Sequence, residues 1–324
     1  MKIIDLHCDT IMALYQNNDV CLKNNSLQID VNKLLSGNYM AQFFAMFLPF
    51  KIENIYEVCL KMIEKYETEV ELNKEHIEFA YSYNDIIDNI NNNKISAILS
   101  IEEGGVVEGS LDKLKHLYDL GVRMICLNWN YINGIGYPNY GKFNADGKPD
   151  YITPNTNDGL TPFGFEMIKM MNELGIIIDV SHLSDKGFWD CINNSTKPIV
   201  ASHSNARAIC KHVRNLTDDM IIALHKNGGV MGMNYCHDFL SDNEEDGRNT
   251  IKWVVNHIKH IKNLVGVDVI ALGSDFDGID PNIELKDASM LNDLINELIK
   301  EGFTLEEIDK ITHKNMLRVI KENI

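Results

Sequence analysis

The sequence predicts an α/β fold, a (β/α)₈ TIM barrel formed by a single domain over residues 1–324, and three observations lead to this prediction. The chain has 324 residues, which is more than an average domain but within the usual length of one barrel. Short apolar runs recur eight times, often followed by a helix-like stretch. No low-complexity linker or abrupt change in composition divides the chain. An open doubly wound sheet is the alternative, because a sequence does not show whether a sheet closes.

The eight apolar runs are the expected strands. Most of them are continuously apolar rather than alternating, which is typical of strands that are covered on both faces in a parallel sheet. In chain order they are residues 3–7, 40–48, 95–103, 122–130, 175–182, 198–203, 228–235 and 269–275. The segment 50–94, between the second and third runs, is expected to be mostly helical.

Helix signals lie between several of the expected strands. Thr161 precedes the stretch PFGFEMIKMMNEL and Thr217 precedes DDMIIALHKN, and a glycine follows each stretch. Thr304 with Glu307 forms a capping box for the last helix. These patterns predict N-capped helices around the strands.

The segment 128–160 interrupts this alternation. It is rich in Asn, Gly, Tyr and Pro, and it is longer than a routine connection between a strand and a helix. Because it follows the fourth expected strand, it would lie on the face where barrel enzymes build their active sites. We expect a long active-site loop that forms a lid or a wall selecting the substrate.

Composition and charge exclude several classes of partner. The formal net charge is −17, from 47 acidic and 30 basic side chains, so nucleic acid and anionic membrane surfaces would repel the protein. The seven cysteines are scattered and include no C-x-x-C pair, which favours a reducing compartment over a disulfide framework. The N-terminal residues contain no signal-peptide pattern, and no apolar run reaches the ~20 residues of a membrane helix. We expect a cytoplasmic protein.

Polar side chains stand where five of the expected strands end, on the face that carries active sites in barrel enzymes. Singly, each has a structural explanation, since an acid there can cap a turn and a histidine can satisfy a hydrogen bond. Together they would be costly to bury without cations, and neutral imidazole suits zinc-type ions. The sequence therefore predicts a metal centre. The residues are His7, Asp9, Glu102, Glu103, His182, His203 and Asp275.

The spacing of His7 and Asp9 supports a shared ligand role. Residues i and i+2 of a strand point the same way, so both side chains can reach one ion. Cys8, between them, is expected to point into packing. Of the remaining histidines, His212 and His237 lie just beyond strand ends, and roles beside the site stay open for them.

An ordered set of motifs resembles the membrane (renal-type) dipeptidases and their bacterial relatives, a branch of the amidohydrolase-like superfamily of metal-dependent hydrolase barrels. The resemblance runs through nearly the whole chain. Its motifs are D-L-H-C-D-T near the start, E-G-G after the third expected strand, D-V-S-H, A-S-H-S-N-A-R, V-R-N-L-T-D-D, G-S-D-F-D-G and N-M-L-R-V-I.

The resemblance implies a zinc dipeptidase with two divalent metal ions, most simply Zn²⁺. One ion would be held by His7, Asp9 and Glu103, and the other by Glu103, His182 and His203. Glu103 is preferred to Glu102 as the shared ligand because the family's acid immediately precedes the Gly-Gly pair. A metal-bridging hydroxide would attack the peptide bond of a small dipeptide. The resemblance also implies a homodimer.

Two further site residues follow from the resemblance. Asp275 matches the acid that faces the bridging water and would be the catalytic base. Arg214 matches the arginine that binds the free C-terminal carboxylate of the substrate.

One position departs from the family. Several members carry a histidine close to the substrate carbonyl after the fourth strand, and the aligned residue here is Trp129. Nearby Asn130 or Tyr131 could donate a hydrogen bond in its place, or the range of substrates differs.

Three other readings remain open. A deaminase or lactonase of the amidohydrolase type would use the same metal centre with a different pocket. A barrel that binds metal but is inactive would act as a partner or sensor. In the third reading, the acids and histidines fill the barrel as structural residues without metal, and a chelator would change neither activity nor stability.

Overall fold

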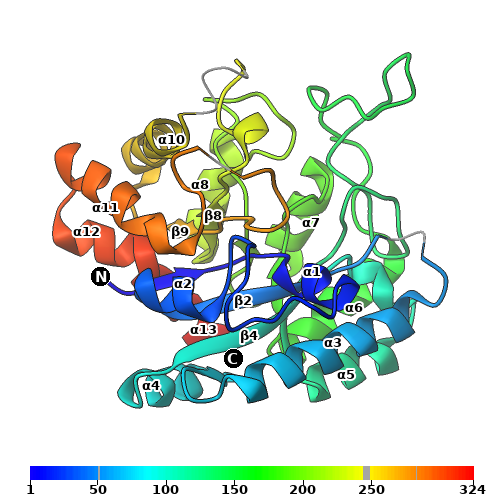
Figure 1. The fold of residues 1–324 in the computed structure, drawn as a ribbon. Coiled ribbons are helices and arrows are strands. Elements are labelled where there is room, and N and C mark those ends of the chain that lie inside the picture. Colours follow the sequence, from blue (N-terminus) through cyan, green and yellow to red (C-terminus); the bar gives the residue numbers. More distant parts are fainter. Residues whose placement is uncertain (50–51, 244–248, 282) are drawn as a thin grey trace.

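The computed structural model describes residues 1–49, 52–243, 249–281 and 283–324. Its centre is one parallel sheet, surrounded by helices (Figure 1). The strands are β1 (Ile3–Asp5), β2 (Tyr39–Phe47), β3 (Ile77–Phe79), β4 (Ile95–Glu102), β5 (Val122–Cys126), β6 (Ile177–Asp179), β7 (Val200–Ala201), β8 (Val230–Met233) and β9 (Ile270–Leu272).

Eight of these strands form a closed ring. β1 pairs with both β2 and β9, and β2 pairs with β4, so the order runs around from β1 to β9 and back. The fold is therefore the (β/α)₈ barrel that the sequence predicts, and each of the eight expected apolar runs overlaps one barrel strand. β3 was not expected. It pairs only with residues 95–97 at the start of β4 and lies outside the ring.

The helices begin and end as the capping signals predict. Thr161 caps α6, Thr217 caps α8, and Thr304 with Glu307 forms the capping box of α12. The α-helices are α1 (Thr10–Gln16), α2 (Val31–Ser36), α3 (Ile55–Leu72), α4 (Tyr83–Asn91), α5 (Leu111–Asp119), α6 (Pro162–Leu174), α7 (Asp185–Asn194), α8 (Asp218–Asn227), α10 (Thr250–Val265), α11 (Leu291–Lys300), α12 (Leu305–Asp309) and α13 (Asn315–Asn323). Within segment 50–94, residues 50–51 lie outside the described part, and α3 and α4 account for most of the rest.

The barrel interior is filled from one end. Buried side chains from all eight barrel strands pack inside the ring, and Met316, Val319 and Ile320 of α13 join the same apolar cluster. A second, larger cluster lies between the strands and the outer helices and includes the buried Cys8. Polar side chains can therefore gather at the other end of the barrel, where the carboxyl ends of the strands lie.

The long segment 128–160 follows β5, as expected. The described structure assigns no helix or strand to it, and isolated bridges join Tyr140 to Pro154 and Phe143 to Pro149. Part of it projects away from the barrel as a green extension in Figure 1. Among the described residues, no helix is both long and apolar enough to cross a membrane.

Candidate active site

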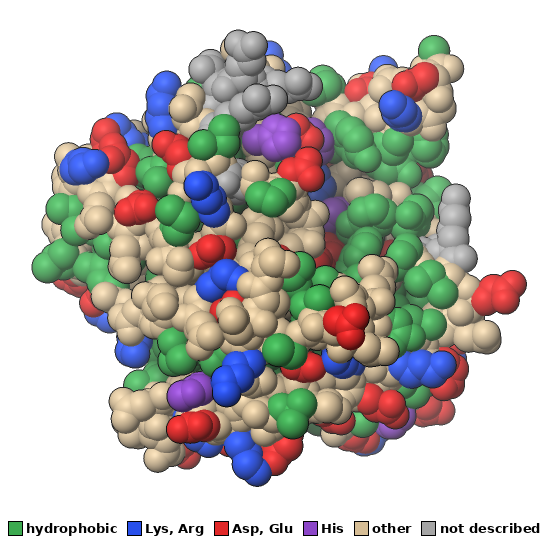
Figure 2. All heavy atoms as spheres, viewed as in Figure 1, with side chains coloured by type: hydrophobic (Ala, Val, Ile, Leu, Met, Phe, Trp, Pro, Cys, Tyr) green, Lys and Arg blue, Asp and Glu red, His purple; other side chains and the backbone are tan. Residues whose placement is uncertain are grey.

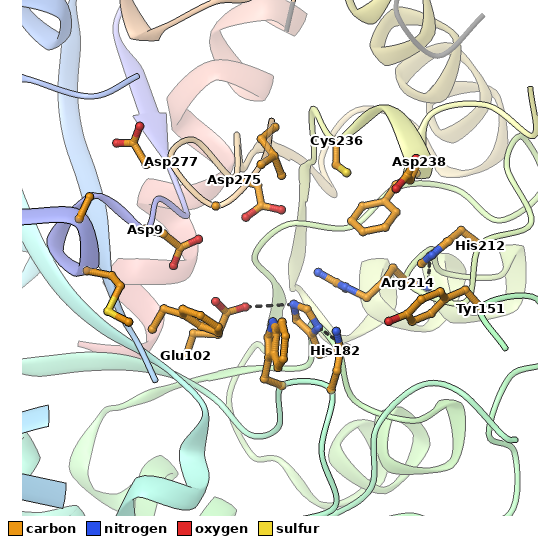
Figure 3. A pocket seen from close by; sticks show the side chains of 18 of the residues that line it. Asp9, Glu102, Tyr151, His182, His212, Arg214, Cys236, Asp238, Asp275 and Asp277 are labelled. Carbon is orange, nitrogen blue, oxygen red and sulfur yellow. Dashed lines mark hydrogen bonds and ion pairs between the residues drawn. The ribbon is translucent and has the colours of Figure 1, made fainter. Parts of the chain in front are cut away.

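A pocket of about 590 Å³ opens among the loops that follow the barrel strands. This volume is within the range typical of small-molecule sites. Figure 2 shows the cleft, with histidine and acidic side chains inside it and hydrophobic side chains along one wall. In Figure 3, Asp9, Glu102, His182 and Asp275 point toward the same space, and Arg214 enters it from another side.

His7 lies at the centre of three carboxylates. Its Nε2 atom is 3.5 Å from Asp9 Oδ2, 3.4 Å from Glu102 Oε2 and 3.9 Å from Asp275 Oδ1. Although burial acts to lower it, the charges of Glu102 and Asp9 raise the pKa of His7 well above its ordinary value. Burial raises the pKa of Glu102 to about 7. Both shifts indicate that these buried acids favour a positive charge beside them.

His182 and His203 both turn a ring nitrogen toward Glu102. Their Nε2 atoms are 3.0 Å and 3.3 Å from Glu102 Oε1, and 3.0 Å from one another. Burial and nearby cationic groups lower the pKa of both histidines well below the ordinary value, so both rings are neutral. A neutral ring carries one proton, and the partner of Nδ1 decides where it is.

The Nδ1 partners assign that proton in both rings. Nδ1 of His182 lies 2.9 Å from Asn130 Oδ1, which only accepts, so this nitrogen donates. Ser202 donates its hydroxyl to Asp179 at 2.5 Å, which leaves its oxygen to accept from His203 Nδ1 at 2.6 Å. Both Nε2 atoms therefore carry lone pairs that face each other and a carboxylate oxygen.

This donor set fits divalent metal ions. Lone pairs of two neutral histidines and a carboxylate oxygen that face one buried space are costly unless a cation lies between them. The ligand atoms of His7, Glu102 and His203 lie within 4.8 Å of one another, as do those of His7, Asp9 and Asp275. Within the described residues, His7 Nε2 and Asp9 Oδ1 are buried without a hydrogen-bond partner. Histidine nitrogens with carboxylate oxygens are the ligands that zinc-type ions prefer.

The structure does not bring Glu103 into this cluster, and the expectation for that residue is corrected to Glu102. β4 ends at Glu102, and the side chain of the next residue, Glu103, points to the opposite face of the strand end. Glu103 also has a positive φ of 93°. Its carboxylate accepts hydrogen bonds from the backbone of Gly105 and Trp129 and from Asn133 Nδ2. Glu103, the residue directly before the Gly-Gly pair, therefore forms hydrogen bonds with the loops that follow β4 and β5.

Asp275 lies on the edge of the cluster as expected. Its Oδ2 accepts a hydrogen bond from Asn234 Nδ2 at 2.9 Å, and its Oδ1 faces His7. Burial raises the pKa of Asp275 above the ordinary value. Its φ of 64° is positive, like that of His182 at 67°. Both residues stand where the chain leaves a strand, and such backbone conformations are typical of functional sites.

Arg214 is the cationic group of the pocket. The side chain is buried, Nη2 donates to the His203 carbonyl at 3.1 Å, and Nε has no hydrogen-bond partner among the described residues. His212 and Tyr151 lie beyond it (Figure 3), with stacked rings 5.0 Å apart. His212 therefore lines the pocket, while His237 does not belong to the described lining.

Aromatic residues form the wall beside His182. Trp129 and Asn130 line the pocket, and the Trp129 ring lies 5.1 Å from Phe47 and 5.9 Å from His182. Tyr131 is not among the described lining residues, and its ring lies behind Trp129 at 5.1 Å. The structure thus brings two of the three loop residues to the pocket.

Sequence reasoning missed the acids that support the histidines. Asp5 and Asp179 are the last residues of β1 and β6, and both are buried. Asp5 accepts from the backbone and hydroxyl of Ser274, which joins the ends of β1 and β9 beneath His7. Asp179 holds Ser202 beside His203. An acid that ends an apolar run, two or three residues before a site histidine, is the signal that could have found both.

Comparisons with known proteins agree with this geometry. The model of the membrane dipeptidase family, peptidase family M19, matches residues 1–323. An uncharacterized dipeptidase of Schizosaccharomyces pombe is 32% identical over 341 aligned positions, covering 98% of this chain and 80% of that protein. An uncharacterized protein of Klebsiella pneumoniae is 40% identical over 228 positions, covering 70% of this chain and 82% of that protein.

Solved structures show the same fold. A metallopeptidase of Rhodobacter sphaeroides, crystallised with a phosphinate mimic of the dipeptide L-Ala-D-Ala, has a TM-score of 0.90 and 24% identity, over 100% of this chain and 99% of that chain. Dipeptidase AC, a metallopeptidase of family M19, has a TM-score of 0.89 and 25% identity, over 100% and 98% of the two chains. The chain therefore belongs to the membrane dipeptidase family, peptidase family M19, and is a metal-dependent hydrolase.

Proposed function

We propose that the protein is a dipeptidase with two divalent metal ions, most simply Zn²⁺, which hydrolyses small dipeptides with a free C-terminal carboxylate. His7, Asp9 and Glu102 would hold one ion, and Glu102, His182 and His203 the other. The observation that carries the proposal is the convergence of two histidine lone pairs on Glu102, beside His7. When bound, such ions would polarise a carbonyl and lower the pKa of a bound water, which would supply a hydroxide nucleophile near neutral pH.

Asp275 is the proposed base. Asn234 fixes one of its oxygens and leaves the other facing the cluster. The raised pKa of this buried carboxyl suits a group that accepts a proton from water and then gives it to the leaving amine. The proton is thus held on a chain atom between the two steps.

Arg214 is the proposed binding group for the substrate carboxylate. A guanidinium can donate two parallel hydrogen bonds to a carboxylate, and burial makes this contact stronger than it would be in water. A pocket of about 590 Å³ with Arg214 in its wall favours a short substrate whose terminus lies close to the scissile bond.

The wall at Trp129 is the proposed contact for the rest of the substrate. Asn130 Oδ1 is engaged by His182, so its Nδ2 is the group that can donate to a substrate carbonyl. Trp129 and Phe47 offer apolar surface to a side chain, with Tyr131 packed behind the indole ring.

The test is metal quantification of purified protein loaded with zinc, paired with hydrolysis of a dipeptide panel. L-Ala-D-Ala belongs in the panel with L,L dipeptides, because its phosphinate mimic binds the Rhodobacter sphaeroides enzyme. We expect two ions per chain and turnover of free dipeptides. Turnover of lactones or nucleobases in place of dipeptides would move the assignment to another amidohydrolase-type reaction. Bound metal without turnover of any of these would indicate an inactive barrel.

A further inference from the structure

Glu103 is a buried carboxylate for which the described part of the chain provides no ion-pair partner. It is fully buried, and its three hydrogen-bond donors are Gly105 N at 2.7 Å, Trp129 N at 3.0 Å and Asn133 Nδ2 at 2.5 Å. Burial raises the pKa of Glu103 above the ordinary value. Burying a carboxyl in this way is costly, and the hydrogen bonds offset that cost only while all three donors stay in place.

Two of these donors belong to the loop that follows β5. Asn133 also donates to the Leu127 carbonyl at 2.9 Å, and its Oδ1 accepts from the backbone of Ile135 and Gly136. Glu103 therefore holds this loop near its beginning, at Trp129, and again at Asn133. The turn between these two points has little freedom to move.

Asn130 lies in that turn and contacts the candidate metal centre. Its Oδ1 accepts from His182 Nδ1 at 2.9 Å, which fixes the tautomer and directs Nε2 at Glu102. His182 itself has a positive φ of 67°, a backbone conformation that persists only when surrounding contacts hold it in place. The ring direction depends on the position of the loop.

We propose that Glu103 is a positioning residue for His182, acting through the loop that carries Asn130. Both consecutive acids then help to orient His182. Glu102 contacts its Nε2 atom directly, whereas Glu103 acts through its hydrogen bonds with Trp129 and Asn133. A carboxylate is required because it accepts from all three donors, whereas a glutamine would turn an NH₂ group toward one of them. The inference rests on the proposed two-metal function.

The first test compares the metal affinity of Glu103→Gln with that of wild type, by titration of the metal-free proteins with zinc. Partners that orient a metal-bound histidine typically contribute roughly 10–100-fold in metal affinity. We expect the affinity of one of the two ions to fall by that factor while the other ion binds as before. Equal affinities for both ions in wild type and Glu103→Gln would overturn the inference.

Glu69→Gln is the matched control. Glu69 is also buried and accepts from a backbone amide, Leu22 N at 2.7 Å, with Lys65 as its ion-pair partner on α3. Glu69→Gln removes a buried charge at a position that is distant in sequence from the loop that carries Asn130. We expect Glu69→Gln to lower the stability of the protein but to leave the affinity for both metal ions unchanged. If Glu69→Gln lost as much metal affinity as Glu103→Gln, the effect of Glu103→Gln would be general destabilisation.

A double-mutant comparison tests the route through Asn130. If Glu103 acts on His182 through the loop, Asn130→Ala weakens the same ion, and adding Glu103→Gln to it produces little further loss. Losses that multiply fully in the double variant would contradict the route. If Glu103→Gln does not fold, Glu103→Asp takes its place, since it keeps the charge and shortens the reach. Absence of metal binding by wild type would instead refute the proposed function.

Discussion

Asp275 carries the proposed proton transfer, and its replacement gives the sharpest prediction for a single residue. In Asp275→Asn the hydrogen bond from Asn234 can be kept, but the side chain no longer accepts a proton. We expect kcat to fall by roughly 10²–10⁴-fold, the usual contribution of a positioned acid–base group, with metal content nearly unchanged. Steady-state kinetics and metal analysis measure both. Turnover near the wild-type value would show that another group is the base.

Arg214 makes a prediction that depends on the substrate. In Arg214→Ala the loss of charge-assisted hydrogen bonds worth about 2–3 kcal/mol should lower kcat/KM for free dipeptides by roughly 30–150-fold. Dipeptide amides, which lack the terminal carboxylate, should be affected much less. Equal losses on free acids and amides would exclude Arg214 as the carboxylate-binding group.

For Glu102 and Glu103, the sequence did not show which of the two acids faces the site. Both acids end the same apolar run and both are buried, so the apolar pattern does not separate them. Consecutive side chains of a strand point to opposite faces, and the structure shows that Glu102 is the one that faces His7. His7, His182 and His203 were predicted from sequence because each is the last residue of its apolar run, and Asp9 because it lies two residues after His7.

At the scale of secondary structure, capping chemistry made several helices predictable. A threonine before the first turn and a glycine after the last gave the bounds of α6 and α8 correctly. β3 could not be predicted in this way, because its three residues Ile77–Phe79 carry no run of apolar side chains and pair only with the start of β4. The strands near the site are also shorter than the apolar runs, since residues such as 202–203 already belong to loops.

Helix α10 contributes a buried histidine that links two loops near the site. His257 Nδ1 accepts from Ala206 N at 3.1 Å, and Nε2 donates to the Leu240 carbonyl at 3.1 Å. Burial lowers the pKa of His257 to about 4, with a smaller contribution from His260. Because the unfolded chain takes up this proton near pH 6.5 and the folded protein only near pH 4, the contribution of His257 to stability is lost as pH falls through this window.

The resulting prediction concerns metal-free protein, so that loss of metal at low pH does not contribute. His257 should account for about 3 kcal/mol of the decrease in unfolding free energy between pH 7 and pH 4. His257→Gln should be less stable at pH 7 but should lose less stability over the same range. Denaturant unfolding at both pH values measures this difference, and parallel pH profiles for the two proteins would contradict it.

At the scale of the whole molecule, closure of the ring brings together side chains that are almost 270 positions apart. Asp275 N donates to the His7 carbonyl, and Asp9 N donates to the Phe276 carbonyl, which joins the two ends of the chain at the site. The sequence predicted the barrel with an open sheet as the alternative, and only the structure decides between the two and gives the volume of the pocket. Closure and pocket volume both depend on how β1 pairs with β9, which no local pattern encodes. One domain over residues 1–324 stays a prediction.

Metal removal should destabilise the whole barrel. Without cations, Asp9, Glu102 and Asp275 are left facing each other around His7 in a buried space. Each zinc ion at 100 times its Kd would contribute about 2.7 kcal/mol, which for a chain of 324 residues corresponds to a fall in Tm of roughly 4 °C per ion when a chelator removes it. Thermal unfolding with and without chelator, and after zinc is restored, measures the change. A Tm that does not respond would indicate acids and histidines that fill the barrel without metal.

The most direct measurement is a crystal structure of the zinc-loaded protein with anomalous diffraction recorded at the zinc edge. We predict two anomalous peaks in the pocket, both within bonding distance of Glu102, one shared with His7 and Asp9 and the other with His182 and His203. Glu103 should remain bonded to the loop at Trp129 and Asn133. A pocket without anomalous signal, or a zinc ion bound to Glu103 in place of Glu102, would contradict the account.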